Sequence, residues 1–265
     1  MLSEKEENGA MQECPADRNI IFLDSTDSTN IQAKRLADEG APHGTVVVAE
    51  TQHAGKGRAG RRWESPAGCN LYFSLLLREG IVPEKASMLT LVMGLSVQEA
   101  VAVCCGVQTQ IKWPNDIVLN GKKIAGILTE MHLQENAAPY VIIGTGVNIK
   151  AQDFLPELEN KATFLESASK EPISREVLLA KILECFDKNL VLFGKKMDLS
   201  LLYTTYNEAL VNLGREVRVL DSAGEYTGTA EGINKEGELL VRLADGRCKQ
   251  VYAGEVSVRG IYGYV

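Results

Sequence analysis

The order of hydrophobic and polar positions predicts that strands and helices alternate up to about residue 213. Short apolar or β-branched runs predict strands over 20–23, 45–50, 70–77, 111–119, 123–133 and 140–149. Apolar residues at helical spacing predict helices over 31–40, from Pro83 to about Cys105, over 174–193 and over 199–213. The dipeptide Asn120-Gly121 predicts a tight hairpin. Residues 150–172 hold few strong structure formers and predict an irregular segment.

The pattern changes after Gly214. Short strands are predicted over 216–220, 226–230, 238–243 and 248–252, separated by turns rich in Asp, Asn and Gly. Strands at this spacing are typical of a small β-barrel of about 50 residues. The chain is therefore expected to consist of a flexible polar tail (1–18), a main domain (19–213) and a small β domain (214–265).

The composition is that of a soluble globular protein. The 265 residues are 45% hydrophobic and 24% charged, and the formal net charge is −7, which argues against broad binding to nucleic acid or anionic membranes. The N-terminal residues are polar and have no apolar signal core. The most apolar stretch, 86–107, is interrupted by Gln98 and Glu99, so we expect a buried helix and no membrane span. A cytoplasmic location follows as an expectation.

Cysteines and histidines give no sign of a disulfide framework or a metal site. The cysteines form no C-x-x-C pair and are spaced irregularly; they are Cys14, Cys69, Cys104, Cys105, Cys185 and Cys248. This usage predicts buried free thiols in a reducing compartment. The three histidines, His43, His53 and His132, are scattered along the chain, so no resident metal is expected.

The stretch GKGRAG, residues 55–60, matches the dinucleotide-binding pattern G-x-G-x-x-G. That site requires a strand before the glycines and a helix directly after them. Here a second strand-like run, 71–77, follows instead, so the Rossmann interpretation fails. A P-loop is excluded as well, because Lys56 is followed by Gly57 rather than Ser or Thr. No G-x-S-x-G elbow supports a Ser-His-Asp hydrolase.

Four short segments concentrate residues that could bind a small molecule. They are 28–30 (STN), 52–63 (QHAGKGRAGRRW), 112–116 (KWPND) and 123–130 (KIAGILTE). Each also has a plain structural interpretation: a helix cap, a solvated loop, a turn and a surface lysine on a strand. Together, however, alternating cations, exposed backbone N–H groups and a tryptophan are what the phosphates and base of a nucleotide need.

In order and spacing these segments resemble the motifs of biotin protein ligases. Residues 55–63 resemble the signature G-R-G-R-x-G-R-x-W, residues 112–116 match K-W-P-N-D, and residues 123–130 match K-x-x-G-I-L-x-E. The stretches 28–30 (STN) and 146–149 (GVNI) also match, and the resemblance covers about residues 20 to 260.

The resemblance implies an α+β fold. It comprises a catalytic domain like that of class II aminoacyl-tRNA synthetases, with a mainly antiparallel sheet, and a C-terminal SH3-like β-barrel. The implied enzyme makes biotinyl-5′-AMP from biotin and ATP, with Mg²⁺ accompanying ATP. It then transfers biotin to a specific lysine of a biotin carboxyl carrier protein, in acetyl-CoA carboxylase or a related carboxylase.

The resemblance also assigns roles by position. Residues matched to biotin binding are Ser28, Thr29, Asn30, Gln52, Lys56, Gly57, Arg58 and Lys123. Residues matched to the nucleotide are Arg58, Arg61, Trp63, Asn115 and Asn148, with Trp63 packing on the adenine and Asn148 reading its edge. Residues matched to catalysis are Arg58, Lys112, Asp116 and Lys123, with Asp116 near the Mg²⁺.

Two departures from the family pattern stand out. Lys56 replaces the first Arg of the signature, which keeps the charge and loses the bidentate geometry. About 27 residues precede Ser28, too few for the helix-turn-helix domain of bifunctional ligase–repressors, so no specific DNA partner is expected. The alternatives are a lipoate- or octanoate-type protein ligase and a biotin-responsive binding protein. The sequence leaves open whether the protein is a monomer or a homodimer.

Overall fold

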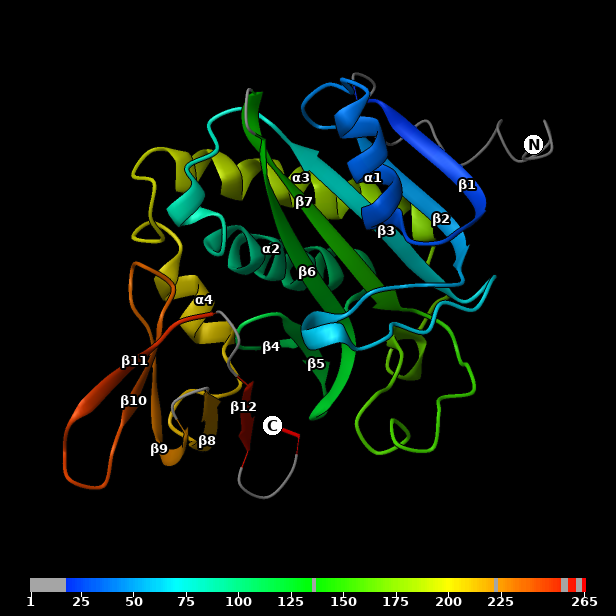
Figure 1. Ribbon diagram of the computed structural model, residues 1–265. Coiled ribbons are helices and arrows are strands. Elements are labelled where there is room, and N and C mark those ends of the chain that lie inside the picture. The colour runs from blue at the N-terminus through cyan, green and yellow to red at the C-terminus, as the bar shows by residue number, and fades with distance from the viewer. Residues whose placement is uncertain (1–17, 135–136, 222–223, 254–256, 261–263) are drawn as a thin grey trace.

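The structure is a computed structural model that describes residues 18–134, 137–221, 224–253, 257–260 and 264–265. The tail expected at 1–18 lies outside the described residues except for Arg18. Two sheets organise the rest of the chain (Figure 1). The four segments singled out in the sequence lie on strands of the larger sheet or on the connections between them, and the smaller sheet follows them in the chain.

The larger sheet has seven strands in the order β1-β2-β3-β7-β6-β5-β4. Their bounds are β1 Ile20–Thr26, β2 Val46–Gln52, β3 Asn70–Leu77, β4 Gln110–Lys112, β5 Asp116–Leu119, β6 Lys122–Gln134 and β7 Ala137–Asn148. Only β1 and β2 pair in parallel, whereas all the other neighbours are antiparallel. The expectation of a mainly antiparallel sheet is confirmed. The segment 52–63, here called the basic loop, joins antiparallel β2 and β3, so no Rossmann unit is formed.

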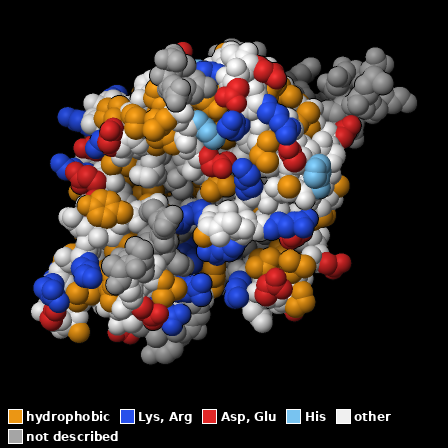
Figure 2. Space-filling view, in the orientation of Figure 1, with side chains coloured by type: hydrophobic (Ala, Val, Ile, Leu, Met, Phe, Trp, Pro, Cys, Tyr) orange, Lys and Arg blue, Asp and Glu red, His pale blue; other side chains and the backbone are white. Residues whose placement is uncertain are grey.

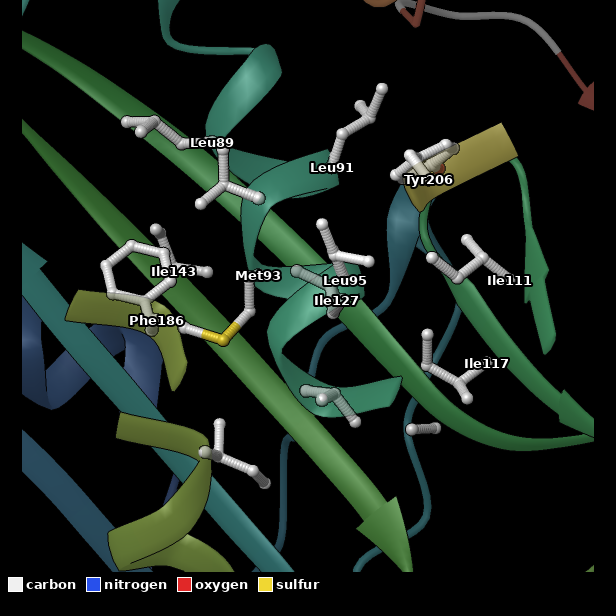
Figure 3. Close-up of a cluster of buried hydrophobic side chains, with 14 of the residues drawn as sticks. Leu89, Leu91, Met93, Leu95, Ile111, Ile117, Ile127, Ile143, Phe186 and Tyr206 are labelled. Carbon is white, nitrogen blue, oxygen red and sulfur yellow. The ribbon is translucent and has the colours of Figure 1, made fainter. Parts of the chain in front are cut away.

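Helices cover both faces of this sheet (Figure 1). Helix α1 (Thr29–Asp38) buries Ala33 and Ala37 against residues such as Ile142 of β7. Helices α2 (Met88–Cys105) and α3 (Arg175–Gly194) pack on the other face, where the neighbouring Ile143 points (Figure 3). The change of face between consecutive residues follows from the two-residue period of a strand. Helix α2 is long and apolar enough to cross a membrane, but 61% of it is buried inside the protein.

Two elements differ from the sequence prediction. The strand expected over 111–119 is split into β4 and β5 by a turn at Trp113–Asn115, because Pro114 has no N–H to donate and interrupts the ladder. The helix expected over 199–213 is only α4 (Tyr203–Ala209). The residues on either side of α4 form backbone hydrogen bonds with distant segments instead of continuing the helix. The N–H of Leu199 donates to the carbonyl of Lys235, and the N–H of Val211 donates to the carbonyl of Ile111.

The smaller sheet has five antiparallel strands in the order β11-β10-β9-β8-β12. They are β8 Glu216–Asp221, β9 Gly224–Ile233, β10 Leu239–Arg242, β11 Cys248–Val251 and β12 Ser257–Gly260. Strand β12 was not predicted from the sequence. The sheet does not close into a barrel among the described residues, because β11 and β12 form its opposite edges. The Trp113 indole N–H donates to the carbonyl of Gly237 at 3.0 Å and so links this domain to the β4–β5 turn.

The cysteines differ in part from the expectation. Cys69, Cys105 and Cys185 are half-buried thiols and Cys248 is an exposed one, so the prediction of thiols is confirmed and the prediction of full burial is wrong. Burial against α2 and α3 nevertheless raises the pKa of Cys105 and of Cys185 to about 11, which leaves both protonated near neutral pH. Cys14 lies outside the described residues.

Candidate functional site

Most of the sequence-predicted residues come together around one cavity. It is about 50 Å³ in volume and lies between the start of α1, the basic loop and the sheet. Its lining includes Ser28, Thr29, Asn30, Gln52, Lys56, Gly57, Arg58, Trp63, Asn115 and Lys123, with Gly126, Gly144 and Gly146 of the sheet. The same loop also borders an open cleft of about 1240 Å³. Figure 2 shows Lys and Arg side chains around the hollow on this face.

A chain of hydrogen bonds builds the polar wall of the cavity. The backbone N–H of Thr29 donates to Gln52 Oε1 at 2.8 Å, and Gln52 Nε2 donates to Ser65 Oγ at 2.9 Å. The hydroxyls of Thr29 and of Ser74 on β3 lie 2.7 Å apart and share a hydrogen bond. These side chains are buried, so each holds the next in one orientation. Donors and acceptors fixed in this way can read the polar edge of a small molecule.

Ser28 is more than a helix cap. It stands at the N-cap position of α1, but its side chain makes no capping hydrogen bond and is buried in the cavity wall. The next residue but one, Asn30, donates to Glu130 at 2.7 Å and accepts from Ser74 at 2.6 Å. A side chain on Gly144 would collide with the Asn30 amide, so only glycine fits there. Ser28-Thr29-Asn30 therefore belongs to the site as well as to the helix start.

Trp63 lies flat on the glycines of the sheet. A Cβ on Gly126 would lie 2.8 Å from the indole ring and one on Gly146 would lie 2.5 Å from it, so neither position admits a side chain. The backbone N–H of Trp63 donates to the carbonyl of Gly55 at 2.9 Å, so the two ends of the segment 55–63 are held together. The indole nitrogen is buried and has no hydrogen-bond partner among the described residues. The ring thus closes one side of the cavity, and its indole N–H is available to donate a hydrogen bond to a ligand.

The basic loop is held from within and from the sheet. The N–H of Gly57 donates to the carbonyl of Arg61 at 2.7 Å, and Ala59 has a positive φ of 55° between them. Arg58 donates to Asn115 Oδ1 at 2.8 Å, and Asn115 in turn donates to the carbonyl of Ile127 at 3.1 Å. Arg58, a predicted site residue, therefore joins the basic loop to the turn between β4 and β5.

Lys56 and Arg61 occupy different places on this loop. The ammonium of Lys56 pairs with Glu130 Oε1 at 3.5 Å, and both residues line the open cleft. Glu130 is the last residue of the segment 123–130, and its sequence context predicted no role for it. Arg61 is exposed and lines the open cleft rather than the small cavity.

Lys112, Asp116 and Lys123 form a charge cluster on three neighbouring strands, in which Lys112 is buried and the other two are partly buried. Lys112 and Asp116 face each other in the β4–β5 hairpin, and Lys123 Nζ lies 2.5 Å from Asp116 Oδ1. Burial alone raises the pKa of Asp116, but the charges of Lys123 and Lys112 outweigh it and hold that pKa below its usual value. Burial lowers the pKa of Lys112 to about 8. The cluster is therefore a net cation at neutral pH.

Lys123 links the cluster to the cavity, because its ammonium lies 5.1 Å from the Trp63 ring centroid. Four predicted residues do not line the small cavity: Lys112 and Asp116 belong to the charge cluster, Arg61 lines the open cleft, and Asn148 lies at the end of β7. The Asn148 amide donates to the carbonyl of Thr163 at 3.1 Å, and its role toward an adenine stays a prediction.

Besides Glu130, two further residues that contact the site escaped the sequence analysis. Ser74 is the polar residue within the apolar run 70–77, and this interruption was the available signal. Tyr264 donates to Asp116 Oδ2, and no motif pointed to it. Among the described residues, no group of three or more His, Cys, Asp or Glu side chains could hold a metal ion.

The arrangement has the chemistry of an anion-activating site. Lys112, Lys123 and Arg58 gather positive charge beside a pocket of fixed hydrogen-bond donors and acceptors. Cations in a partly buried site can bring two anionic reactants together and stabilise the charge that develops between them. No nucleophilic side chain of the protein is needed for such a reaction.

Comparison with known protein families gives two adjacent matches. Residues 21–148 match the Biotin/lipoate A/B protein ligase family, and residues 213–259 match the Biotin protein ligase C terminal domain. The second match starts at the boundary seen between the two sheets.

Individual relatives match over most of their length. The chain is 38% identical to the Bifunctional ligase/repressor BirA of Bacillus subtilis, over 97% of this chain and 79% of that protein. It is 33% identical to the Biotin–[acetyl-CoA-carboxylase] ligase of Paracoccus denitrificans, over 90% of this chain and 100% of that protein. A solved biotin protein ligase from Aquifex aeolicus, in complex with biotin and ATP, superposes with a TM-score of 0.79 at 33% identity, covering 91% of this chain and 99% of that one.

Proposed function

The chain belongs to the biotin protein ligase family and is an enzyme of that type, and we propose that it works in two steps through biotinyl-5′-AMP. In the first step the carboxylate of biotin attacks the α-phosphorus of ATP and pyrophosphate leaves. In the second, a lysine amine of a biotin carboxyl carrier domain attacks the acyl carbon and AMP leaves. The alternative of a biotin-responsive binding protein without catalysis is wrong for this family.

The observation that carries this proposal is the continuity between the polar cavity and the charge cluster. Lys123 lies at their junction, lining the cavity and pairing with Asp116. A biotin ring held by Thr29 and Gln52 would direct its carboxylate toward this junction. Mutual repulsion of carboxylate and phosphate is the main obstacle to the first step, and the cations at the junction reduce it.

The basic loop suits the protection of the intermediate. A mixed anhydride of biotin and AMP hydrolyses in water, so the site must exclude water between the two steps. The loop 55–63 already lies over the cavity through Trp63 and Arg58. We assign Ser28, Thr29, Asn30, Gln52 and the backbone at Gly57 to biotin. Arg58, Arg61, Trp63, Asn115 and Asn148 are assigned to the nucleotide.

Mg²⁺ is proposed to enter as a complex with the phosphates of ATP. Asp116 is the carboxylate of the charge cluster, and its two oxygens are engaged by Lys123 and Tyr264. This arrangement does not offer a ready carboxylate ligand, whereas Mg²⁺ bound to a nucleotide keeps phosphate and water oxygens as its main ligands. Asp116 then acts by fixing the two lysines.

Further parts of the proposal concern fold and setting. We assign the main domain to the class II aminoacyl-tRNA synthetase-like catalytic fold on the basis of its mainly antiparallel sheet, and the small domain to the SH3-like type on the basis of its five short antiparallel strands. ATP as substrate and thiol cysteines suit a cytoplasmic enzyme. The oligomeric state, monomer or homodimer, is to be measured by light scattering with and without biotin and ATP.

Incubation of the pure protein with Mg-ATP, biotin and an apo carrier domain of acetyl-CoA carboxylase tests the function. We expect pyrophosphate release that depends on biotin, followed by a mass increase of the carrier equal to one biotinyl group. Replacement of biotin by lipoate or octanoate should give neither product. Modification of the carrier by lipoate in preference to biotin would establish the lipoate-type alternative instead.

A further inference from the structure

Tyr264 and Val265 fold back from the small domain onto the hairpin that carries the charge cluster. A Cβ on Gly121, in the β5–β6 turn, would lie 3.3 Å from a methyl group of Val265. A Cβ on Gly260, in β12, would collide with the Val265 carbonyl. Figure 1 shows the C-terminal end beside β12 and below β5. The last two residues therefore bridge the two sheets.

Tyr264 contacts two members of the cluster at once. Its hydroxyl donates to Asp116 Oδ2, while the other carboxylate oxygen pairs with Lys123. The ammonium of Lys112 lies 3.8 Å from the centroid of the Tyr264 ring, which is a close cation–π contact. One side chain from the small domain thus fixes both the anion and a cation of the site.

The ionisation of these groups fits that arrangement. Burial and the charge of Asp116 raise the pKa of Tyr264 well above its usual value, so the phenol stays protonated and remains a donor. Lys112 is 6% exposed and its pKa falls because of burial. The charged groups that face Lys112 are Asp116, Lys123, Arg259 and Arg61, and Tyr264 covers its ammonium.

We propose that Tyr264 is a positioning residue of the ligase reaction, which holds Asp116 and Lys112 in the orientation required for adenylate formation. The proposal rests on the proposed function and adds a residue from outside its motifs. In this proposal Tyr264 acts through its two partners, Asp116 and Lys112. The physical reason is that groups fixed before the reaction need no reorganisation as charge develops, whereas a free lysine side chain does.

Two substitutions of Tyr264 separate the hydroxyl from the ring. Tyr264→Phe removes the donor to Asp116 and keeps the ring over Lys112, whereas Tyr264→Leu removes both. Tyr252→Leu is the matched control, because Tyr252 also belongs to the small domain and is 68% exposed. The measurement is biotin-dependent pyrophosphate release, from which kcat and the KM for biotin are obtained across pH 6 to 10, together with the thermal unfolding midpoint.

For Tyr264→Phe we expect kcat to fall about tenfold, as for loss of one charge-assisted hydrogen bond, with the KM for biotin within about twofold of wild type. The pH at which kcat of this variant falls on the alkaline side should not change, because the ring still covers Lys112. For Tyr264→Leu, kcat should fall further and the alkaline limb should move up by about one pH unit, because water then reaches Lys112 and raises its pKa. A loss of stability alone would not move the alkaline limb of the pH profile of kcat.

Gly260→Ala tests the same contact without altering Tyr264. Gly260 has no positive φ, so its backbone accepts alanine, but the added Cβ displaces Val265 and with it Tyr264. We expect the phenotype of Tyr264→Leu.

The outcomes are separable. If wild type is active and Tyr264→Phe retains its kcat and pH profile, Tyr264 does not position the cluster; Phe preserves the packing, so this variant decides even if the Leu variant unfolds. Faster turnover in the variants would show that the segment obstructs the site, and would equally overturn the proposal. A wild-type protein without biotin-dependent pyrophosphate release refutes the proposed function itself.

Discussion

The indole of Trp63 rests directly on the backbone of Gly146, where an added Cβ would come within 2.5 Å of the ring nitrogen. The aromatic ring from the loop therefore packs against a position on β7 that has no side chain. The glycine belongs to the Gly-Val-Asn-Ile stretch and the tryptophan to the basic loop, which are 83 residues apart in the chain. Their contact explains why the loop closes on this part of the sheet.

Gly146→Ala should weaken biotin and nucleotide binding by about tenfold or more, the order expected for one misplaced methyl group in a fitted pocket. The methyl group displaces Trp63, and isothermal calorimetry and tryptophan fluorescence report the change. Gly194→Ala is the control, because nothing lies within 4 Å of an added Cβ at that helical position. Unchanged affinity in Gly146→Ala would mean that the Trp63 contact is irrelevant to the liganded state.

Lys123→Ala should reduce biotin affinity by roughly 1.5–3 kcal/mol, the usual worth of a hydrogen bond to a charged group. Removal of the ammonium also leaves Asp116 without the ion pair now made at 2.5 Å. The neighbouring Lys122→Ala is the matched control, because Lys122 donates to the exposed carbonyl of Glu159 instead. Calorimetry that finds equal biotin affinity for the two variants would remove Lys123 from the site.

Lys56→Ala should speed the escape of biotinyl-AMP, whereas Lys56→Arg should retain it as well as or better than wild type. In this structure Lys56 pairs with Glu130 at 3.5 Å, and both side chains are partly exposed. Such a pair contributes little, so unfolding free energies should stay within about 0.5 kcal/mol of wild type. The decisive quantity is the dissociation rate of preformed biotinyl-AMP, and equal rates in all three proteins would leave the phosphate to Arg58 and the loop backbone.

Lys112→Met should stabilise the fold at neutral pH while abolishing adenylate formation. The folded pKa of Lys112 is about 8, below its ordinary value of 10.5. Between these pH values the unfolded chain binds a proton that the folded protein lacks, so the free energy of unfolding rises with pH across that window. Below pH 8 the folded protein bears the full cost of the buried ammonium, and Met removes it. Thermal melts should show a gain that shrinks from pH 8 to 10.5; a gain independent of pH would contradict this account.

No sequence-specific DNA binding is expected of this chain. Its formal net charge is −7, and Arg58, Lys112 and Lys123 engage partners inside the site. Gel retardation at about 150 mM salt, where weak charge binding is screened, is the appropriate measurement. Biotin-dependent retardation of the protein's own promoter fragment, and not of an unrelated fragment of equal length, would overturn the expectation.

The sequence by itself determined most of the strands and most of the residues that line the cavity. The run 70–77 coincides with β3, and Asn120-Gly121 forms the predicted turn, with φ of 50° and 77°, because both signals depend on local backbone preferences. The ordered motifs predicted most of the polar residues that line the cavity.

Only the tertiary structure decided which side chains meet. Ser74 reaches Thr29 because β3 passes beneath α1, Glu130 receives Lys56 because the basic loop folds over β6, and Tyr264 reaches Asp116 from the small domain. Each of these pairs joins positions far apart in the chain, and no local propensity encodes such a contact. The ends of β4 and α4 were likewise set by bonds to distant backbone, as where Val211 donates to Ile111. Partner choice of this kind depends on packing, which is a property of the whole fold rather than of any segment.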